Sequence, residues 1–191
     1  MKVVAFNGSA RKGGNTSILL NAVLEEVKRE GVETELVEMA GENLQGCIAC
    51  FKCLENKDQR CSVDKDSVND YIEKMLAADA VILGSPTYFA DASSNMRALI
   101  ERAGMVARCN ENMLRHKLGA GVVAVRRAGA YQVFSSLNAF FLISEMIVVG
   151  SSYWNIGIGK NAGEVNEDRE GLDTMRDLGI NMSWLLKRVC H

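Results

Sequence analysis

The sequence predicts an α/β fold in which helices cover both faces of a parallel β-sheet. Short apolar segments typical of strands alternate with amphipathic segments typical of helices along the chain. The third strand-like segment is apolar at every position, as strands of a parallel sheet covered on both faces are. With 191 residues, the chain is long enough to bury one sizeable core.

Five segments are predicted to be strands because apolar residues stand between glycine-containing or polar stretches. They are Lys2–Phe6, Thr34–Val37, Ala80–Gly84, Gly121–Val125 and Ile147–Val149. Five further segments carry apolar residues at the three- and four-residue spacings of a helix. They are Thr16–Glu30, Asp66–Ala78, Ser93–Arg108, Gln132–Met146 and Gly171–Val189. Ligands of such sheets bind beyond the carboxyl ends of the strands, so the loops after the strands are the expected sites. The weakly patterned stretch 151–169 is long for a connection, and long ordered loops are often functional or interfacial.

The loop after the first predicted strand has the composition of a phosphate site. It joins a strand to the start of a helix, where backbone N–H groups and the helix dipole attract an anion. Its polar side chains are Ser9, Arg11, Asn15, Thr16 and Ser17. The loop lacks the lysine of a nucleoside-triphosphate loop and the G-x-G-x-x-G pattern of a dinucleotide loop. A terminal monophosphate such as that of FMN therefore fits best, and the alternative is a polar turn that only caps the helix.

The loop after the third predicted strand contains the chain's one proline, at a point where a buried strand must turn sharply. A flavin ring needs flat apolar contact and N–H donors to its pyrimidine edge. Pro86, Tyr88 and Phe89 could supply the contact, and the amides of Thr87 to Phe89 could supply the donors. Asp91 completes the candidate residues of this loop. The alternative is an ordinary turn capped by a serine.

The fourth predicted strand ends in Arg126 and Arg127, and Gly129 follows two residues later. An arginine at this edge of the sheet could face the flavin pyrimidine and stabilise an anionic reduced flavin. One of the two could instead bind the phosphate of a nicotinamide donor or an acidic partner. A solvated pair of charges is the third possibility.

Four cysteines form the motif C-x2-C-x2-C-x7-C. Cys47, Cys50 and Cys53 can surround one face of a cubane cluster, and Cys61 can complete the set. A [4Fe-4S] cluster is therefore the first expectation. Zinc is one alternative, although zinc sites more often use two separated C-x2-C pairs. Free thiols, or a cluster that is lost in air, are the other alternative.

The composition excludes several classes of function. The net charge is −2 and there is no basic stripe, so nucleic acid is not an expected partner. The longest apolar stretch, 139–149, is too short to span a bilayer, so no membrane association is expected. No signal-peptide pattern precedes the first strand, and a cytoplasmic location is expected. There, six cysteines favour metal or redox chemistry over disulfides, although Cys109 and Cys190 lie outside the motif and are expected to be incidental.

With these motifs, the chain resembles the iron-sulfur flavoproteins within the NADPH-dependent FMN reductase group of flavodoxin-like proteins. The resemblance covers essentially the whole chain. It rests on Gly8-Ser9-x-Arg11 with Asn15-Thr16, on Ser85-Pro86-Thr87-Tyr88 and on the four-cysteine loop. In the C-terminal half it rests on Arg126-Arg127-Ala128-Gly129, Gly150–Asn155 and Glu170-Gly171-Leu172. It implies a flavodoxin-like three-layer sandwich with a five-stranded parallel sheet in the order 2-1-3-4-5. It also implies that residues 1–191 form a single FMN-binding domain, with a cysteine-rich insertion loop at about 46–62.

The same resemblance implies FMN on the first two loops, a homodimer or homotetramer, and a [4Fe-4S] cluster on Cys47, Cys50, Cys53 and Cys61. The implied activity is that of a flavin-dependent oxidoreductase in which the cofactor carries the chemistry, so that no side chain is needed as an acid or a base. Electrons are expected to pass singly from a ferredoxin-like donor through the cluster to FMN. They then leave to a small acceptor such as dioxygen, peroxide or a quinone. Two alternatives stay open: an NAD(P)H-dependent FMN or quinone reductase without a functional cluster, and a zinc-bound carrier without turnover.

Overall fold

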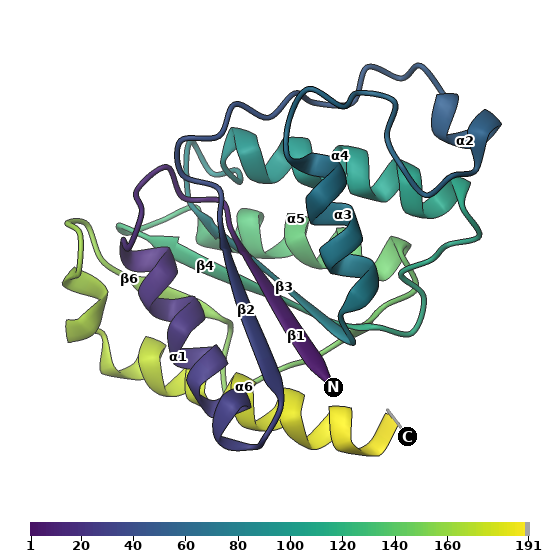
Figure 1. Cartoon of the computed structure of the whole chain (residues 1–191). Helices are drawn as coiled ribbons and strands as arrows, with labels where there is room; N and C mark the ends of the chain where they lie inside the picture. Colours follow the sequence, from purple (N-terminus) through teal and green to yellow (C-terminus); the bar gives the residue numbers. More distant parts are fainter. Residues whose placement is uncertain (190–191) are drawn as a thin grey trace.

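The computed structural model describes residues 1–189, in which a six-stranded sheet lies between two layers of helices (Figure 1). The strands are β1 (Lys2–Asn7), β2 (Glu33–Glu38), β3 (Ala80–Pro86), β4 (Leu118–Val125), β5 (Ile147–Val148) and β6 (Ile156–Ile158). The helices are α1 (Asn15–Arg29), α2 (Lys52–Asn56), α3 (Val68–Ala77), α4 (Ser94–Cys109), α5 (Ala130–Ile143) and α6 (Arg169–Val189), with a 3-10 turn η1 (Glu164–Glu167). Each predicted strand and helix corresponds to one of these elements.

The sheet confirms the predicted strand order. Its path is β2-β1-β3-β4-β5, and every pair of neighbours is parallel. The chain runs from β1 outward to β2 and then crosses back to β3 on the other side of β1. The order therefore reverses between β1 and β3, and the loops beyond their carboxyl ends flank the crevice where ligands of such sheets bind.

The position beside β4 is shared by two short strands rather than filled by the one strand predicted. β5 pairs with Leu118 and Gly119, whereas β6 pairs with the other end of β4, at Val123 to Val125. Between them the chain leaves the sheet, and Asn155 fills the gap. Its Nδ2 donates to the carbonyl of Gly121 at 3.0 Å, and its carbonyl accepts from the N–H of Val123 at 2.9 Å. The stretch 151–169 thus contains β6 and η1, which are too short to produce a periodic apolar pattern.

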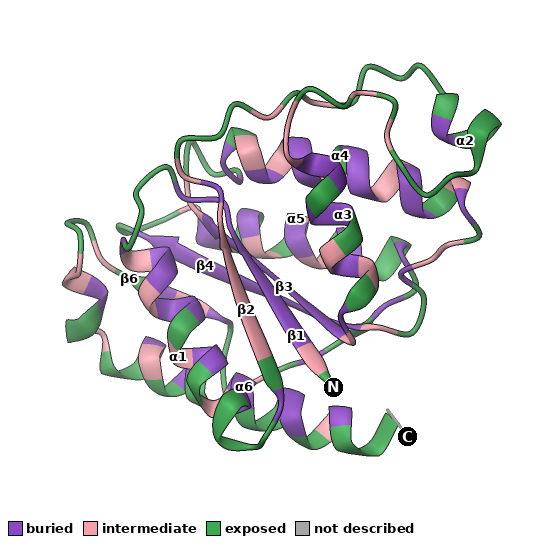
Figure 2. Ribbon diagram, viewed as in Figure 1, coloured by how far each residue is buried: buried purple, intermediate pink, exposed green. Residues whose placement is uncertain are grey.

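Two apolar cores form because both faces of the sheet are covered. Within β1, Val4 and Phe6 pack against the layer of α3, α4 and α5, while Val3 and Ala5 pack against α1 and α6. Figure 2 shows the inner strands buried along most of their length between these layers. Phe6 meets Tyr71 of α3 edge-to-face, with ring centroids 5.7 Å apart. This double burial explains why the strand segments are nearly all apolar.

The helix α2 was not predicted, and it lies within the cysteine-rich loop at the edge of the molecule (Figure 1). It has five residues and is flanked by Phe51 and Lys57, both with left-handed backbone angles. Such a short turn has no apolar periodicity to reveal it. The last helix also begins earlier than expected, at Arg169 rather than at Gly171. None of the helices described is long and apolar enough to cross a membrane.

Candidate functional site

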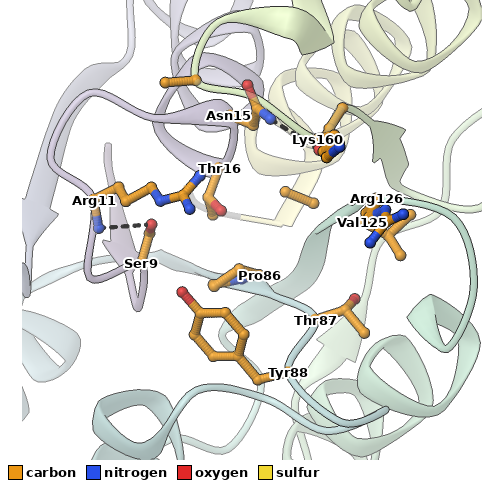
Figure 3. Close-up of a pocket in the computed structure, with 13 residues that line it drawn as sticks. Ser9, Arg11, Asn15, Thr16, Pro86, Thr87, Tyr88, Val125, Arg126 and Lys160 are labelled. Carbon is orange, nitrogen blue, oxygen red and sulfur yellow. Dashed lines mark hydrogen bonds between the residues drawn. The ribbon is translucent and has the colours of Figure 1, made fainter.

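The loops after β1, β3, β4 and β6 surround a pocket of about 290 Å³ at the carboxyl edge of the sheet (Figure 3). The first loop contributes Ser9, Arg11, Asn15 and Thr16, and the second contributes Pro86, Thr87 and Tyr88. The end of β4 adds Ala124, Val125 and Arg126, and the loop after β6 adds Gly159, Lys160 and Ala162. The strand order thus gathers four segments that are far apart in the sequence.

The first loop offers the open start of α1 to the pocket. The N-cap residue is Gly14, so the alternative in which a serine or threonine caps this helix does not hold. Ser9 fixes the loop, because its Oγ accepts from the N–H of Arg11 at 3.1 Å and its own N–H donates to Oδ1 of Asn7 at 3.0 Å. Thr16 is buried and lines the pocket. An uncapped helix N-terminus beside a cation is a favourable place for a phosphate.

Asn15 lies at the pocket, but its side chain is engaged with the opposite wall. Its Nδ2 donates to the carbonyl of Gly159 at 3.0 Å (Figure 3). The same Nδ2 donates to the carbonyl of Asn161 at 2.9 Å, and Oδ1 accepts from the N–H of Gly163 at 2.9 Å. Both amide hydrogens are therefore used within the protein. Asn15 holds the loop after β6 against the first loop, instead of supplying the side-chain donor to phosphate that its position predicted.

Ser17 faces away from the pocket. Its hydroxyl is buried and donates to Oε1 of Glu38 at 2.8 Å, which ties α1 to the end of β2. Asn7 donates to the other oxygen of the same carboxylate at 2.8 Å. Ser17 therefore supports the loop and does not line the pocket.

The pocket is strongly cationic. Among the residues described, its lining includes Arg11, Arg126 and Lys160 and contains no carboxylate. The three cations exceed the two negative charges of a phosphate dianion by one, so the pocket can also stabilise one further negative charge. Arg127 is exposed and lies outside the lining.

The second loop carries a buried hydroxyl that lacks a partner. Thr87 Oγ1 makes no hydrogen bond within the described part of the chain, although it is buried. The N–H of Thr87 donates to the carbonyl of Ala124, and the N–H of Tyr88 donates to the carbonyl of Asp91, each at 2.9 Å. Two of the three amides predicted as flavin donors are thus used to hold the loop. A buried polar atom without a partner calls for an explanation, and a ligand in this pocket supplies one.

A tight turn closes the second loop. Tyr88 and Asp91 pair across it, and Phe89 and Ala90 at its tip have positive φ angles of 50° and 61°, typical of a type I′ turn. The ring of Phe89 is fully exposed and Asp91 bonds to the next N–H, so neither lines the pocket. Gly129, with a φ of 87°, packs on this turn, where a Cβ would lie 3.1 Å from Cβ of Ala90. Gly129 therefore supports the second loop from behind.

A separate cavity of about 20 Å³ is lined by all four cysteines of the motif. Cys47 and Cys50 are exposed, Cys61 is half-buried and Cys53 is buried. Across residues 1–189, no three His, Cys, Asp or Glu side chains stand close enough together to hold a metal ion as they are placed. The donor set nevertheless fits an iron–sulfur cluster, because four soft thiols share one cavity with a buried cation, Arg102.

Arg102 forms a buried ion pair with Asp66, at 2.6 Å between Nη1 and Oδ2. Burial alone would raise the pKa of Asp66. The hydrogen bonds from Arg102 and from the N–H groups of Gln45 and Val68 outweigh it, and they lower this pKa below its usual value. The same guanidinium donates through Nε to Sγ of Cys61 at 3.3 Å. The cysteine loop is therefore fastened to α4 by a charged group.

The thiols of the motif differ in their surroundings. Burial, together with a hydrogen bond to Cys109, raises the pKa of Cys53 to about 11. The hydroxyl of Ser62, 3.2 Å from Sγ of Cys50, lowers the pKa of that exposed thiol. Cys109, expected to be incidental, thus contacts a thiol of the motif but does not line the cavity. Cys190 lies outside the described residues.

We expect the Asp66–Arg102 pair to make stability depend on acid pH. Because the pKa of Asp66 is lower in the folded chain than the value of about 3.9 in unfolded chains, the pair contributes fully above about pH 4. Its contribution is lost as the pH falls through the folded value. The variant Asp66→Asn should lower the free energy of unfolding at pH 7 by about 3 kcal/mol, since it leaves a buried cation unpaired. Urea unfolding between pH 2.5 and 7 should show this difference shrinking in acid, and a constant difference would contradict the assignment.

Sequence reasoning missed Lys160, Asp66 and Arg102. Lys160 lies in the long stretch 151–169. The length of this stretch indicated a functional or interfacial loop but did not identify any particular residue in it. Asp66 was placed at the start of a helix, and Arg102 within one, and no pattern of sequence spacing links either to Cys61. Their roles depend on packing of α4 against the cysteine loop.

The sequence model of the family described as NADPH-dependent FMN reductase matches residues 1–161. An iron-sulfur flavoprotein of Methanocaldococcus jannaschii is 36% identical over 196 aligned residues, which cover 99% of each chain. An iron-sulfur flavoprotein of Methanosarcina thermophila is 34% identical over 191 aligned residues, covering 99% of this chain and 97% of that one. Among solved structures, the WrbA-like flavodoxin protein from Agrobacterium tumefaciens aligns with a TM-score of 0.68 at 16% identity, covering 98% of this chain and 97% of the other. The fold is therefore flavodoxin-like.

Proposed function

Because the chain belongs to the iron-sulfur flavoproteins of the NADPH-dependent FMN reductase family, we propose that this FMN-dependent oxidoreductase also holds a [4Fe-4S] cluster, on Cys47, Cys50, Cys53 and Cys61. Its reaction is electron transfer from a ferredoxin-like donor to a small acceptor such as dioxygen, peroxide or a quinone. The cluster supplies one-electron chemistry, and FMN supplies both one- and two-electron chemistry. One observation carries the proposal: the same chain has a cationic pocket at a helix N-terminus and a separate cavity lined by four thiols.

The first loop is proposed to bind the FMN phosphate. The N–H groups at the start of α1 face it, and Arg11 adds a charge-assisted hydrogen bond, with the hydroxyls of Ser9 and Thr16 beside them. Pro86 and Tyr88 would then hold the flavin ring, and the hydroxyl of Thr87 would gain the partner it lacks. Arg126 and Lys160, which also line the pocket, would favour the anionic reduced form of the flavin.

The thiol chemistry supports iron and sulfide over zinc. The three closely spaced thiols Cys47, Cys50 and Cys53 can surround one face of a cubane, whereas zinc sites prefer two separated pairs. A cytoplasmic location, where thiols stay reduced, is part of the proposal. Binding of iron must displace the proton of Cys53, whose pKa is about 11.

A second candidate is an NAD(P)H-dependent FMN or quinone reductase without a functional cluster. It is favoured by the cationic excess of the pocket and by the exposed Arg127 next to Arg126, which together suit a phosphate-bearing donor. In this case hydride would reach FMN directly and the cysteines would be bystanders.

One experiment separates the two candidates. The protein is purified without oxygen, its iron, sulfide, zinc and FMN are measured, and it is mixed in a stopped-flow instrument with reduced ferredoxin or with NADPH. About four iron and four sulfide per chain, with rapid reduction by ferredoxin, support the proposal. Rapid bleaching of FMN by NADPH alone supports the second candidate. One zinc per chain contradicts a cluster, and colourless protein that does not take up FMN contradicts both.

We also propose that the chain forms a homodimer or homotetramer. The helix α5 carries exposed apolar side chains on its outer face, among them Tyr131, Leu142 and Ile143. Trp154 meets Tyr131 edge-to-face and extends this surface, with ring centroids 5.8 Å apart. Contiguous exposed apolar surface of this kind is typical of a protein interface. Sedimentation of the holoprotein measures the state directly, and a monomer at all concentrations contradicts the proposal.

The variant Arg11→Ala should weaken FMN binding by roughly 10-fold, the value expected for loss of a charge-assisted hydrogen bond of about 1.5 kcal/mol at a partly solvated site. Titration of apoprotein with FMN, followed by quenching of flavin fluorescence, measures the change. Lys12→Ala is the matched control, because Lys12 is the adjacent exposed cation and does not line the pocket. Equal weakening in the two variants would show that only the net charge of the loop matters.

A further inference from the structure

Arg102 is the most unusual side chain outside the FMN pocket. It lies on α4 with none of its surface exposed, and it is among the largest fully buried side chains of the described residues. An arginine is rarely buried completely unless all its donors are used. The mechanism at the FMN pocket does not require it, since Arg102 lines the cysteine cavity instead.

The guanidinium joins both ends of the cysteine loop. Nη1 donates to both carboxylate oxygens of Asp66, at 2.6 and 2.7 Å, and to the carbonyl of Gln45 at 3.2 Å. Nη2 donates to the carbonyl of Val63. Nε donates to Sγ of Cys61 at 3.3 Å. One planar group thus clamps the loop before its first cysteine and after its last one, and also contacts a sulfur.

Arg102 does not need its contact with Sγ of Cys61 in order to hold the cysteine loop in place. Asp66 and the carbonyls of Gln45 and Val63 accept from Nη1 and Nη2 and fasten the loop. The N–H on Nε is directed at a sulfur atom by the rigidity of the guanidinium plane. The hydrogen-bond partners described for the other thiols of the motif are neutral. Cys50 pairs with the hydroxyl of Ser62, and Cys53 pairs with the thiol of Cys109. Among the four thiols described, Cys61 is therefore the one that accepts from a cation.

We propose that Arg102 is a positioning residue that raises the reduction potential of the cluster through its hydrogen bond to Cys61. This inference rests on the proposed [4Fe-4S] site. Reduction adds negative charge to the cluster and its thiolate sulfurs. A donor held against one of those sulfurs stabilises the reduced state more than the oxidised one. Because Arg102 is fully buried, water screens its N–H only weakly from Cys61.

The test is a redox titration of the anaerobic holoprotein, followed by electron paramagnetic resonance for the cluster and by absorbance for FMN. Arg102→Lys keeps the charge but removes the planar Nε donor. We expect the equilibrium constant for cluster reduction to fall at least tenfold, which for one electron is a shift of about 59 mV to more negative potential. The FMN potential in the same titration should stay unchanged, since Arg102 does not line that pocket.

Asp66→Asn is the matched control because it breaks the ion pair and keeps Nε against Cys61. It leaves the positive charge less neutralised, so the cluster potential should stay the same or become more positive. Equal negative shifts in both variants would mean that the clamp acts only by holding the loop, and would overturn the inference. An unchanged potential in Arg102→Lys overturns it as well.

A measurement on the unaltered chain covers the case in which the variants fail to hold a cluster. Protein labelled with ¹⁵N-arginine should show a nitrogen coupling in pulsed electron paramagnetic resonance of the reduced cluster. Absence of this coupling overturns the inference while the cluster proposal stands. Absence of iron and sulfide from anaerobically purified protein instead overturns the proposed cluster and, with it, the role of Arg102.

Discussion

Replacing Cys53 with serine is expected to abolish cluster binding and leave FMN binding intact. Cys53 is the buried thiol of the motif and lines the cavity with the other three cysteines. A serine oxygen is a poor ligand for the iron of such a cluster, which is held by four thiolates. Iron and sulfide measured after anaerobic purification should fall from about four per chain to near zero. Retained FMN affinity shows that the chain still folds, because the FMN pocket contains none of these cysteines.

Cys109→Ser is the matched control for this variant. Cys109 is a hydrogen-bond neighbour of Cys53 but does not line the cavity, so its loss should leave the iron content unchanged. If Cys109→Ser lost the cluster while Cys61→Ser retained it, Cys109 would be the fourth ligand and the proposed ligand set would be wrong. Iron retained in Cys53→Ser would exclude Cys53 from the set.

Replacing Asn15 with alanine is expected to weaken FMN binding by roughly 100-fold, although its side chain is not placed to donate to the cofactor. The change leaves the carbonyl of Gly159 and the N–H of Gly163 without their partner, and it removes one of the two hydrogen bonds to the carbonyl of Asn161. The two partly buried groups left unpaired, on Gly159 and Gly163, cost about 1 kcal/mol or more each, and the loop that carries Lys160 is released from the pocket wall. FMN titration of apoprotein measures the loss, and crystals of the variant should show loop 159–163 displaced.

Asn21→Ala is the control for the same helix. Asn21 is exposed on α1, and its Nδ2 contacts only Ser17 among the described residues, at 3.5 Å. Both substitutions replace asparagine with a stronger helix former, so a difference between them reports the loop contacts and not the helix. Normal FMN affinity in Asn15→Ala would show that the loop after β6 is not needed to complete the site.

The parts of the fold that the sequence predicted depend on local pattern. The wholly apolar segment at Ala80 and the helical spacing from Val68 to Leu76 each indicate an element whose faces are buried in a known way. The parts that it did not predict depend on distant contacts. β6 forms because β5 pairs with only one end of β4, which leaves Val123 to Val125 at the other end to pair with β6. Asn155 bridges the gap between the two short strands by bonding to Gly121. A three-residue strand stabilised in this way leaves no periodic signal.

The positions of motifs along the sequence located the two candidate sites. The flavin site follows from loops after parallel strands, which meet at one edge of the sheet, and the thiol site follows from the spacing of the four cysteines. The sequence predicted Ser9, Arg11 and Thr16 as phosphate-binding residues, and all three line the pocket. The sequence did not indicate that the side chain of Asn15 bonds to Gly159 across the pocket, or that Ser17 faces away from the pocket and bonds to Glu38. The direction of such a side chain depends on which hydrogen-bond partner lies close to it in the folded chain. The sequence alone does not show which distant residues folding brings together.

By itself, the sequence determined the layered fold, the motifs that indicate flavin and thiol chemistry, and the edge of the sheet where the flavin motifs meet. These follow from residue type and periodicity, which act over a few neighbouring positions. Only the tertiary structure decided that Lys160 completes the pocket, that Thr87 keeps an unsatisfied hydroxyl in it, and that Arg102 reaches Cys61. Hydrogen bonds and ion pairs act over about 3 Å in space, and residues 41 or 144 positions apart in the chain become neighbours only through packing.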